Sequence, residues 1–163
     1  MKTNEFGPAL AGILAEITTG TPVNGGFVLN GGDHGLLASL DQLSATDASR
    51  SSQGGATVAA HAAHLAFGLS LLNRWATEGG NPFAGAHWYE AWQITAVDGP
   101  HWQHIRDNLR KEAGQWQEVL YTPREVAEIE LKGMFGSVAH LAYHLGAIRQ
   151  ILAQARGPKD HSG

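Results

Sequence analysis

The 163-residue sequence contains no cysteine. A chain without cysteine forms no disulfide, offers no thiolate to a metal ion and has no thiol nucleophile of its own. Any thiol chemistry would therefore need a thiol supplied from outside the chain. A single domain of this length buries a sizeable core, so we expect the fold to be stable without covalent cross-links.

The sequence also has few charges, and its lysines and arginines form no cluster. Charged residues make up 16% of the chain and the formal net charge at pH 7 is −4. Without a basic cluster we expect no nucleic-acid-binding surface. The longest apolar-rich stretch, residues 58–72, is too short to span a bilayer, and residues 1–8 lack the apolar core of a signal peptide. We therefore expect a cytoplasmic protein that is not associated with membranes. Its expected partner is a small-molecule substrate.

Apolar residues recur at three- and four-residue intervals, and no useful strand-like alternation appears. The patterns predict helices over residues 8–17, 35–43, 56–78 and 100–120, and a final helix from the capping box Thr122-Pro-Arg-Glu to Gly157-Pro158, interrupted near Gly133 and Gly136. We expect one all-α domain over residues 1–163, most simply a four-helix bundle, in which residues 1–34 form the first helix and a glycine-rich loop and residues 158–163 a flexible tail.

Two pairs of histidines stand in apolar helical surroundings. His140 and His144 are four residues apart in the last predicted helix, so both side chains lie on one face. His61 and His64 lie on the helix predicted over residues 56–78, and the sequence barely separates them as inward-facing candidates. Three neutral imidazoles around Zn²⁺ or Ni²⁺ leave positions open for water or substrate, as in catalytic sites. The alternative is that these are core histidines satisfied by hydrogen bonds.

Two known metal motifs are absent. The zinc-protease motif requires Glu directly after the first histidine, where this chain has Leu141. Di-iron bundles require a Glu three residues before an inward histidine, and no carboxylate stands at such a position here. His101 and His104 lie near the start of a predicted helix and are expected to be exposed. Trp88 and Trp92, in the connection before that helix, are expected to pack over the bundle or to line a pocket.

These residues resemble the DinB/YfiT superfamily of DinB-like proteins. The resemblance rests on His61-Ala-Ala-His64-Leu-Ala-Phe and on His140-Leu-Ala-Tyr-His144-Leu-Gly-Ala-Ile-Arg-Gln, and it spans roughly residues 35–155. It implies an up-down-down-up four-helix bundle, often a homodimer, in which three histidines bind a divalent metal. The family's ligands match His140, His144 and His64, which precedes an aliphatic residue as in the family, with His61 as the second candidate. Tyr143 stands where many relatives have another histidine.

The resemblance also suggests an activity. Characterised relatives include enzymes that use low-molecular-weight thiols, such as bacillithiol transferases and mycothiol-dependent isomerases. We therefore expect a metal-dependent enzyme in which zinc or nickel activates an external thiol or water, of the thiol transferase, isomerase or hydrolase type. The competing hypothesis is a non-catalytic bundle that binds a ligand or partner in a tryptophan-lined cavity. The sequence assigns no acid–base residue.

Overall fold

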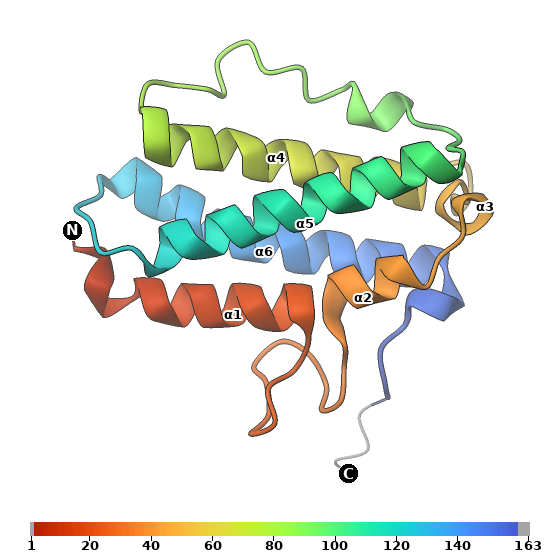
Figure 1. Ribbon diagram of the computed structural model, residues 1–163, viewed down its shortest axis with the longest axis horizontal. Coiled ribbons are helices and arrows are strands. Elements are labelled where there is room, and N and C mark those ends of the chain that lie inside the picture. Colours follow the sequence, from red (N-terminus) through yellow and green to blue (C-terminus); the bar gives the residue numbers. More distant parts are fainter. Residues whose placement is uncertain (1, 160–163) are drawn as a thin grey trace.

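The computed structural model describes residues 2–159, so the predicted tail lies largely outside the described residues (Figure 1). The regular elements of the described chain are helices: α1 (Gly7–Thr19), α2 (Gly35–Asp41), α3 (Ala45–Ala48), α4 (Val58–Glu78), α5 (Gly99–Tyr121) and α6 (Glu128–Ile151), with short 3₁₀ turns η1 (Thr3–Glu5), η2 (Ala91–Gln93) and η3 (Ala153–Ala155). The all-α prediction is confirmed. Among the described residues, none of the helices combines the length and apolar character that crossing a bilayer requires.

The four long helices lie side by side (Figure 1). α4 packs against α5 and α6, and α1 packs against the same two helices from the other side. In Figure 1, where colour follows the sequence, α1 and α6 run from left to right and α4 and α5 from right to left. The short helix α2 follows the glycine-rich loop and packs on α1 and α5. This arrangement places the two histidine-bearing helices, α4 and α6, next to each other.

The core is built on the apolar seam of α5. Its members recur at three- and four-residue steps and are all buried: Trp102, Ile105, Leu109, Ala113, Trp116 and Leu120. A buried indole N–H needs a partner. The N–H of Trp116 donates to Oγ of Ser137 on α6 at 2.8 Å, and the N–H of Trp102 donates to the carbonyl of Leu43 at 2.9 Å. The two tryptophans thus tie α5 to α6 and to the segment after α2.

The starts of two long helices follow from their capping residues. The hydroxyl of Thr57 accepts the N–H of Ala60 at 3.1 Å, and α4 begins directly after Thr57. The carboxylate of Asp98 accepts the N–H of His101 at 2.8 Å, and a proline stands in the first turn of α5. The start of the helix predicted from residue 100 is therefore confirmed to within one residue.

The predicted start of the last helix at Thr122 is wrong. Thr122 ends α5, and its hydroxyl donates back to the carbonyl of Glu118 at 2.9 Å. A residue of the predicted capping box, Arg124, bonds to the N-terminal segment instead of starting a helix. The N–H of Arg124 donates to Oγ of Thr3 at 2.8 Å, and the N–H of Thr3 donates to the carbonyl of Arg124 at 2.9 Å. Because Thr3 takes these groups, α6 begins only at Glu128.

The predicted interruption of the last helix is also wrong, because α6 is continuous through Gly133 and Gly136. Gly133 serves close packing. A Cβ atom at this position would lie only 2.9 Å from the ring of Trp75 on α4. At Gly136 a Cβ would meet no atom within 4 Å. One of the two glycines thus lets α4 and α6 approach each other, and neither breaks the helix.

The last helix ends at Ile151, earlier than the predicted end at Gly157, because the chain turns back on itself. The guanidinium of Arg149 donates to the carbonyl of Ala155 at 3.1 Å and pairs with the carboxylate of Asp33 at 2.8 Å. Asp33 is only 4% exposed. This buried ion pair holds the turn after α6 against the end of the glycine-rich loop.

Candidate metal centre

Four histidine side chains from α4 and α6 meet between these two helices. Nε2 of His140 lies 3.1 Å from Nε2 of His64 and 2.8 Å from Nε2 of His144. His64, His140 and His144 each offer one ring nitrogen to a group whose members all lie within 4.8 Å of one another. Nδ1 of His61 lies 2.8 Å from Nδ1 of His144. The structure thus brings together the three histidines selected by the resemblance. It places His61 against the other ring nitrogen of His144, the one outside the group.

The local sequence explains this convergence. The four-residue spacing places His140 and His144 on one face of α6, and the three-residue spacing turns His61 and His64 toward the same side of α4. Gly68, one turn further along α4, leaves room for the α6 side chains. A Cβ atom at Gly68 would stand 3.9 Å from the ring of His140 and 3.5 Å from that of Trp88.

The geometry of the three inner nitrogens suits a cation. In the plane of a neutral imidazole, each nitrogen carries either one proton or one lone pair. Nε2 of His140 faces two other Nε2 atoms. Its single proton or lone pair cannot form a good hydrogen bond with both of them. A metal ion at the meeting point would accept all three lone pairs. The three-histidine group contains no carboxylate. Its donor set is therefore purely imidazole.

Burial keeps these imidazoles neutral. His64 is 8% exposed and His144 is 4% exposed. Burial, reinforced by the neighbouring histidines, lowers the pKa of His144 to about 3 and that of His64 to about 4. Burial also lowers the pKa of His61 and of His140. The neutral form is the one that binds metal, so the site has its lone pairs available near neutral pH without deprotonation.

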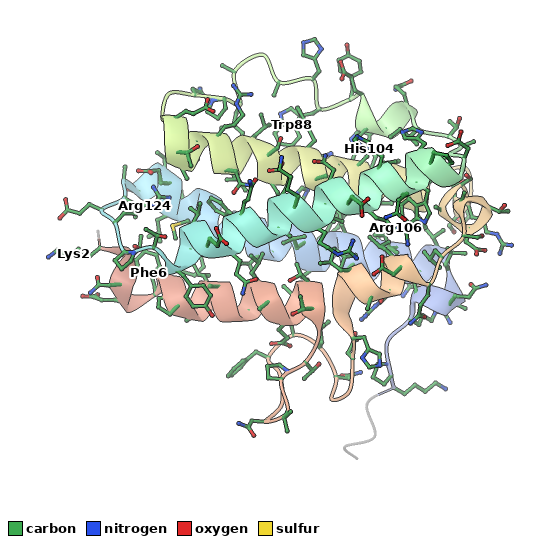
Figure 2. The ribbon with its side chains drawn as sticks, viewed as in Figure 1. Lys2, Phe6, Trp88, His104, Arg106 and Arg124 are labelled. Atoms are coloured by element: carbon green, nitrogen blue, oxygen red, sulfur yellow. The ribbon has the colours of Figure 1, made fainter. Side chains whose placement is uncertain are left out.

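Two tryptophans, expected from the sequence to pack over the bundle or to line a pocket, contact the histidines. They belong to the connection between α4 and α5, whose η2 turn packs on α4. The ring of Trp92 stacks at a tilt on His64 with centroids 4.4 Å apart, and its edge contacts His61. Trp88 lies 5.6 Å from His64, and Figure 2 shows it between the connection and α4. These apolar rings limit the access of water to the imidazoles.

The Nδ1 atoms of His64 and His144, which lie outside the three-nitrogen group, have different surroundings. Nδ1 of His64 is buried and has no hydrogen-bond partner among the described residues. Nδ1 of His144, in contrast, has His61 as its partner. The sequence indicated that both His61 and His64 face inward and left open whether His61 replaces His64 or joins it. It did not predict the contact between His61 and His144.

Other candidates from the sequence lie outside the three-histidine group. His101 and His104 are exposed on α5, as predicted, and His104 is labelled in Figure 2. Tyr143 is 69% exposed and packs only its ring edge against His144, with centroids 5.0 Å apart. It is a surface aromatic and not an inward-facing phenol.

The chain was compared with protein-family models, with curated proteins and with solved structures, and none of the three comparisons found a match. The likeness to DinB/YfiT proteins therefore depends on the histidine motifs of the sequence. The candidate metal centre is accordingly interpreted from its own geometry.

Proposed function

We propose that this protein is a metal-dependent enzyme of the DinB/YfiT type, in which His64, His140 and His144 hold a divalent ion, zinc or nickel. The observation that carries the proposal is the convergence of three Nε2 atoms from two helices, those of buried His64 and His144 and of half-buried His140. Imidazole is a preferred ligand of both metals, and three protein ligands leave a position free for a substrate.

The separations between the nitrogens are compatible with such an ion. Zinc–nitrogen bonds of about 2.0–2.1 Å in a tetrahedron hold the ligand nitrogens roughly 3.3–3.4 Å apart. The distances of 3.1 Å and 2.8 Å around His140 lie a few tenths of an ångström below this value. Small side-chain rotations make up that difference.

The ion would supply Lewis acidity, which lowers the pKa of a thiol or water that binds it and makes it a nucleophile near neutral pH. The protein's own residues prepare the site. His64, His140 and His144 present neutral nitrogens, His61 accepts the hydrogen bond from Nδ1–H of His144, and Trp92 limits the access of water. Because the chain has no cysteine, the thiol would be an external low-molecular-weight compound.

We also propose that α1, α4, α5 and α6 form the up-down-down-up bundle that the resemblance implies. The directions of the four helices in Figure 1 and the packing of α4 and α1 against both α5 and α6 support this topology. In such a bundle, metal sites are built from side chains on facing helices, as with α4 and α6 here.

Metal analysis tests the proposal directly. Protein prepared without a metal-affinity step and loaded with Zn²⁺ or Ni²⁺ should retain about one ion per chain after gel filtration, since the three histidines form one site. The double variant His64→Ala/His140→Ala should retain almost none. The matched control is His101→Ala/His104→Ala, which removes the same number of histidines from the exposed face of α5 and should retain the ion. Full occupancy in the first double variant would refute the site.

A catalytic test separates the enzyme from the competing hypothesis. Metal-loaded protein should accelerate the reaction of a small thiol with an electrophile, and a chelator should remove this acceleration. If the wild-type protein binds neither metal, the non-catalytic bundle with core histidines is favoured instead. If it binds metal but accelerates only hydrolytic reactions, water replaces the thiol as the activated group.

A further inference from the structure

A cavity of about 210 Å³ between α4 and α6 adjoins His140. Its walls are mostly apolar. They include Leu65, Leu69 and Leu72 of α4 and Leu141 of α6, with Phe83 and Trp88 from the connection. The rings of Phe83 and Trp88 are nearly parallel, at 3°, with centroids 6.5 Å apart. We call this cavity the apolar slot.

Glycines make the slot possible. Gly68, Gly133 and Gly136 line it, so three positions at which side chains could fill the space between the helices carry none. Gly133 is in close contact with Trp75, but at Gly68 an added Cβ would stand 3.5 Å from Trp88, at ordinary contact distance. A methyl group at Gly68 would thus fit in contact with Trp88 and His140, and a larger side chain there would occupy part of the slot.

His140 is the polar side chain of the slot that contacts the other histidines of the candidate metal centre. Of the lining residues, Ser137 and His140 have polar side chains, and Trp88 carries an indole N–H. Oγ of Ser137 donates to the carbonyl of Met134 at 2.7 Å and accepts the N–H of Trp116 at 2.8 Å. Its hydrogen-bonding capacity is thus used by the protein. His140 remains as the polar end of an otherwise apolar space, and it is one of the proposed ligands.

The volume indicates the size of the occupant. An engineered apolar cavity of about 150 Å³ is known to hold benzene. The slot, at about 210 Å³, is somewhat larger and therefore accommodates a single aromatic ring with a short substituent. Burial of an apolar group there replaces contact with water by contact with leucine and aromatic side chains, which is favourable.

A second hollow, at the protein surface, borders the slot. This hollow of about 540 Å³ shares Phe83 and Gly133 with the slot and is lined further by Asn81 and Lys132. Lys132 is exposed and pairs with Glu128 at 2.6 Å, so this end lies at the protein surface. The slot thus runs from His140 at its inner end toward polar residues at its outer end.

We propose that the apolar slot binds the hydrocarbon part of the substrate, a single aromatic ring or a short branched alkyl group, with the reactive atom at the His140 end. The proposal rests on the proposed function for its direction, since His140 is taken as a metal ligand. The binding of the hydrocarbon itself depends only on the slot. The two ideas therefore fail in different experiments.

The first experiment uses toluene, which has no atom that ligates a metal, and the metal-free protein. Toluene should shift the NMR signals of the Leu69 and Leu141 methyl groups. Its affinity should fall several-fold in Gly68→Ala and at least ten-fold in Gly68→Val, because the added methyl groups enter the slot. Gly114→Ala and Gly114→Val are the matched controls. Gly114 lies on the exposed side of α5, where an added Cβ meets nothing within 4 Å, and these variants should bind toluene normally.

Failure to bind toluene, or equal binding in wild type and Gly68→Val, would overturn the slot. Neither result would affect the measured metal content, which tests the proposed function separately. Conversely, a protein that binds toluene but no metal would keep the slot and lose the proposed chemistry.

The second experiment uses the metal-loaded protein and tests whether a substrate in the slot reaches the metal ion at the His140 end. Benzyl mercaptan should bind at least ten-fold more tightly than ethanethiol to the wild type, because its thiol reaches the metal while its ring fills the slot. Gly68→Val, compared with the wild type at equal metal content, should bind the two thiols with similar affinity, because the valine methyl groups occupy the slot. A preference that persists in Gly68→Val would show that the slot does not serve the metal centre and would overturn the substrate assignment.

Discussion

His61 and His144 face each other through their Nδ1 atoms, which lie 2.8 Å apart. At this distance the two nitrogens form a hydrogen bond, in which one carries the proton and the other accepts the bond. If Nε2 of His144 gives its lone pair to a metal, the ring proton is on Nδ1 and is donated to His61. Outer partners of this kind set the tautomer and the orientation of a ligating histidine.

Replacing His61 should weaken metal binding without abolishing it. In His61→Ala, we expect the same amount of bound zinc at saturation but an affinity about 10- to 100-fold lower, as is typical when an outer partner is lost. Competition with a chromophoric chelator measures this. His61→Asn, whose side-chain oxygen accepts a hydrogen bond, should recover part of the loss. If His61→Ala binds no zinc, as expected for His64→Ala, then His61 is itself a ligand.

The metal-free protein should lose stability as the pH falls from 7 to 5. Burial lowers the folded-state pKa of His144 to about 3 and of His64 to about 4, whereas the unfolded chain titrates near about 6.5. Between these values the unfolded state binds more protons, so acid favours unfolding. Each of the two histidines should contribute about 2 kcal/mol over this interval. Urea unfolding at both pH values measures the loss, and His64→Leu should reduce it by about 2 kcal/mol, the contribution of His64. An unchanged free energy of unfolding would contradict the burial of these groups.

The pair between Asp33 and Arg149 should contribute far more than an exposed pair. Arg149→Leu leaves the carboxylate of Asp33, which has 3% side-chain exposure, buried without its cation. We expect a loss of about 3–5 kcal/mol in the free energy of unfolding. The control is Arg110→Leu, which breaks an exposed pair with Asp41 at 2.7 Å and should cost less than about 1 kcal/mol. Equal effects of the two substitutions, measured by urea unfolding, would argue against the buried contact.

Two glycine-to-alanine substitutions should have opposite effects on the stability of the protein. Gly114→Ala on the surface of α5 should stabilise the protein by up to about 1 kcal/mol, because alanine favours a helix more than glycine does. Gly133→Ala gains the same preference but pushes a methyl group to 2.9 Å from the ring of Trp75. Overpacking of this kind costs about 1–3 kcal/mol, so Gly133→Ala should be less stable than Gly114→Ala by that amount. Thermal unfolding of both variants checks the difference. Equal melting temperatures would show that α4 and α6 separate easily.

Local interactions along the chain made much of the fold predictable. The apolar seam from Trp102 to Leu120 requires a helix with one buried face, and Asp98 supplies its cap. The four-residue spacing of His140 and His144 places both on one face in any α-helix. These features depend only on neighbours within a turn or two, so the sequence was sufficient to identify them.

Contacts between distant segments decided the rest. Thr122 has the sequence of a helix start, but Thr3 takes the backbone groups of Arg124, and nothing near residue 122 indicates that competition. Residues His61 and His64 differ in direction by only about 60° around the helix axis. Both therefore face the bundle, and only the packing of α4 against α6 places His64 within the three-nitrogen group and His61 behind His144. The sequence alone determined which helix faces carry the imidazoles, whereas the distances between helices, which no local pattern encodes, determined which nitrogens meet.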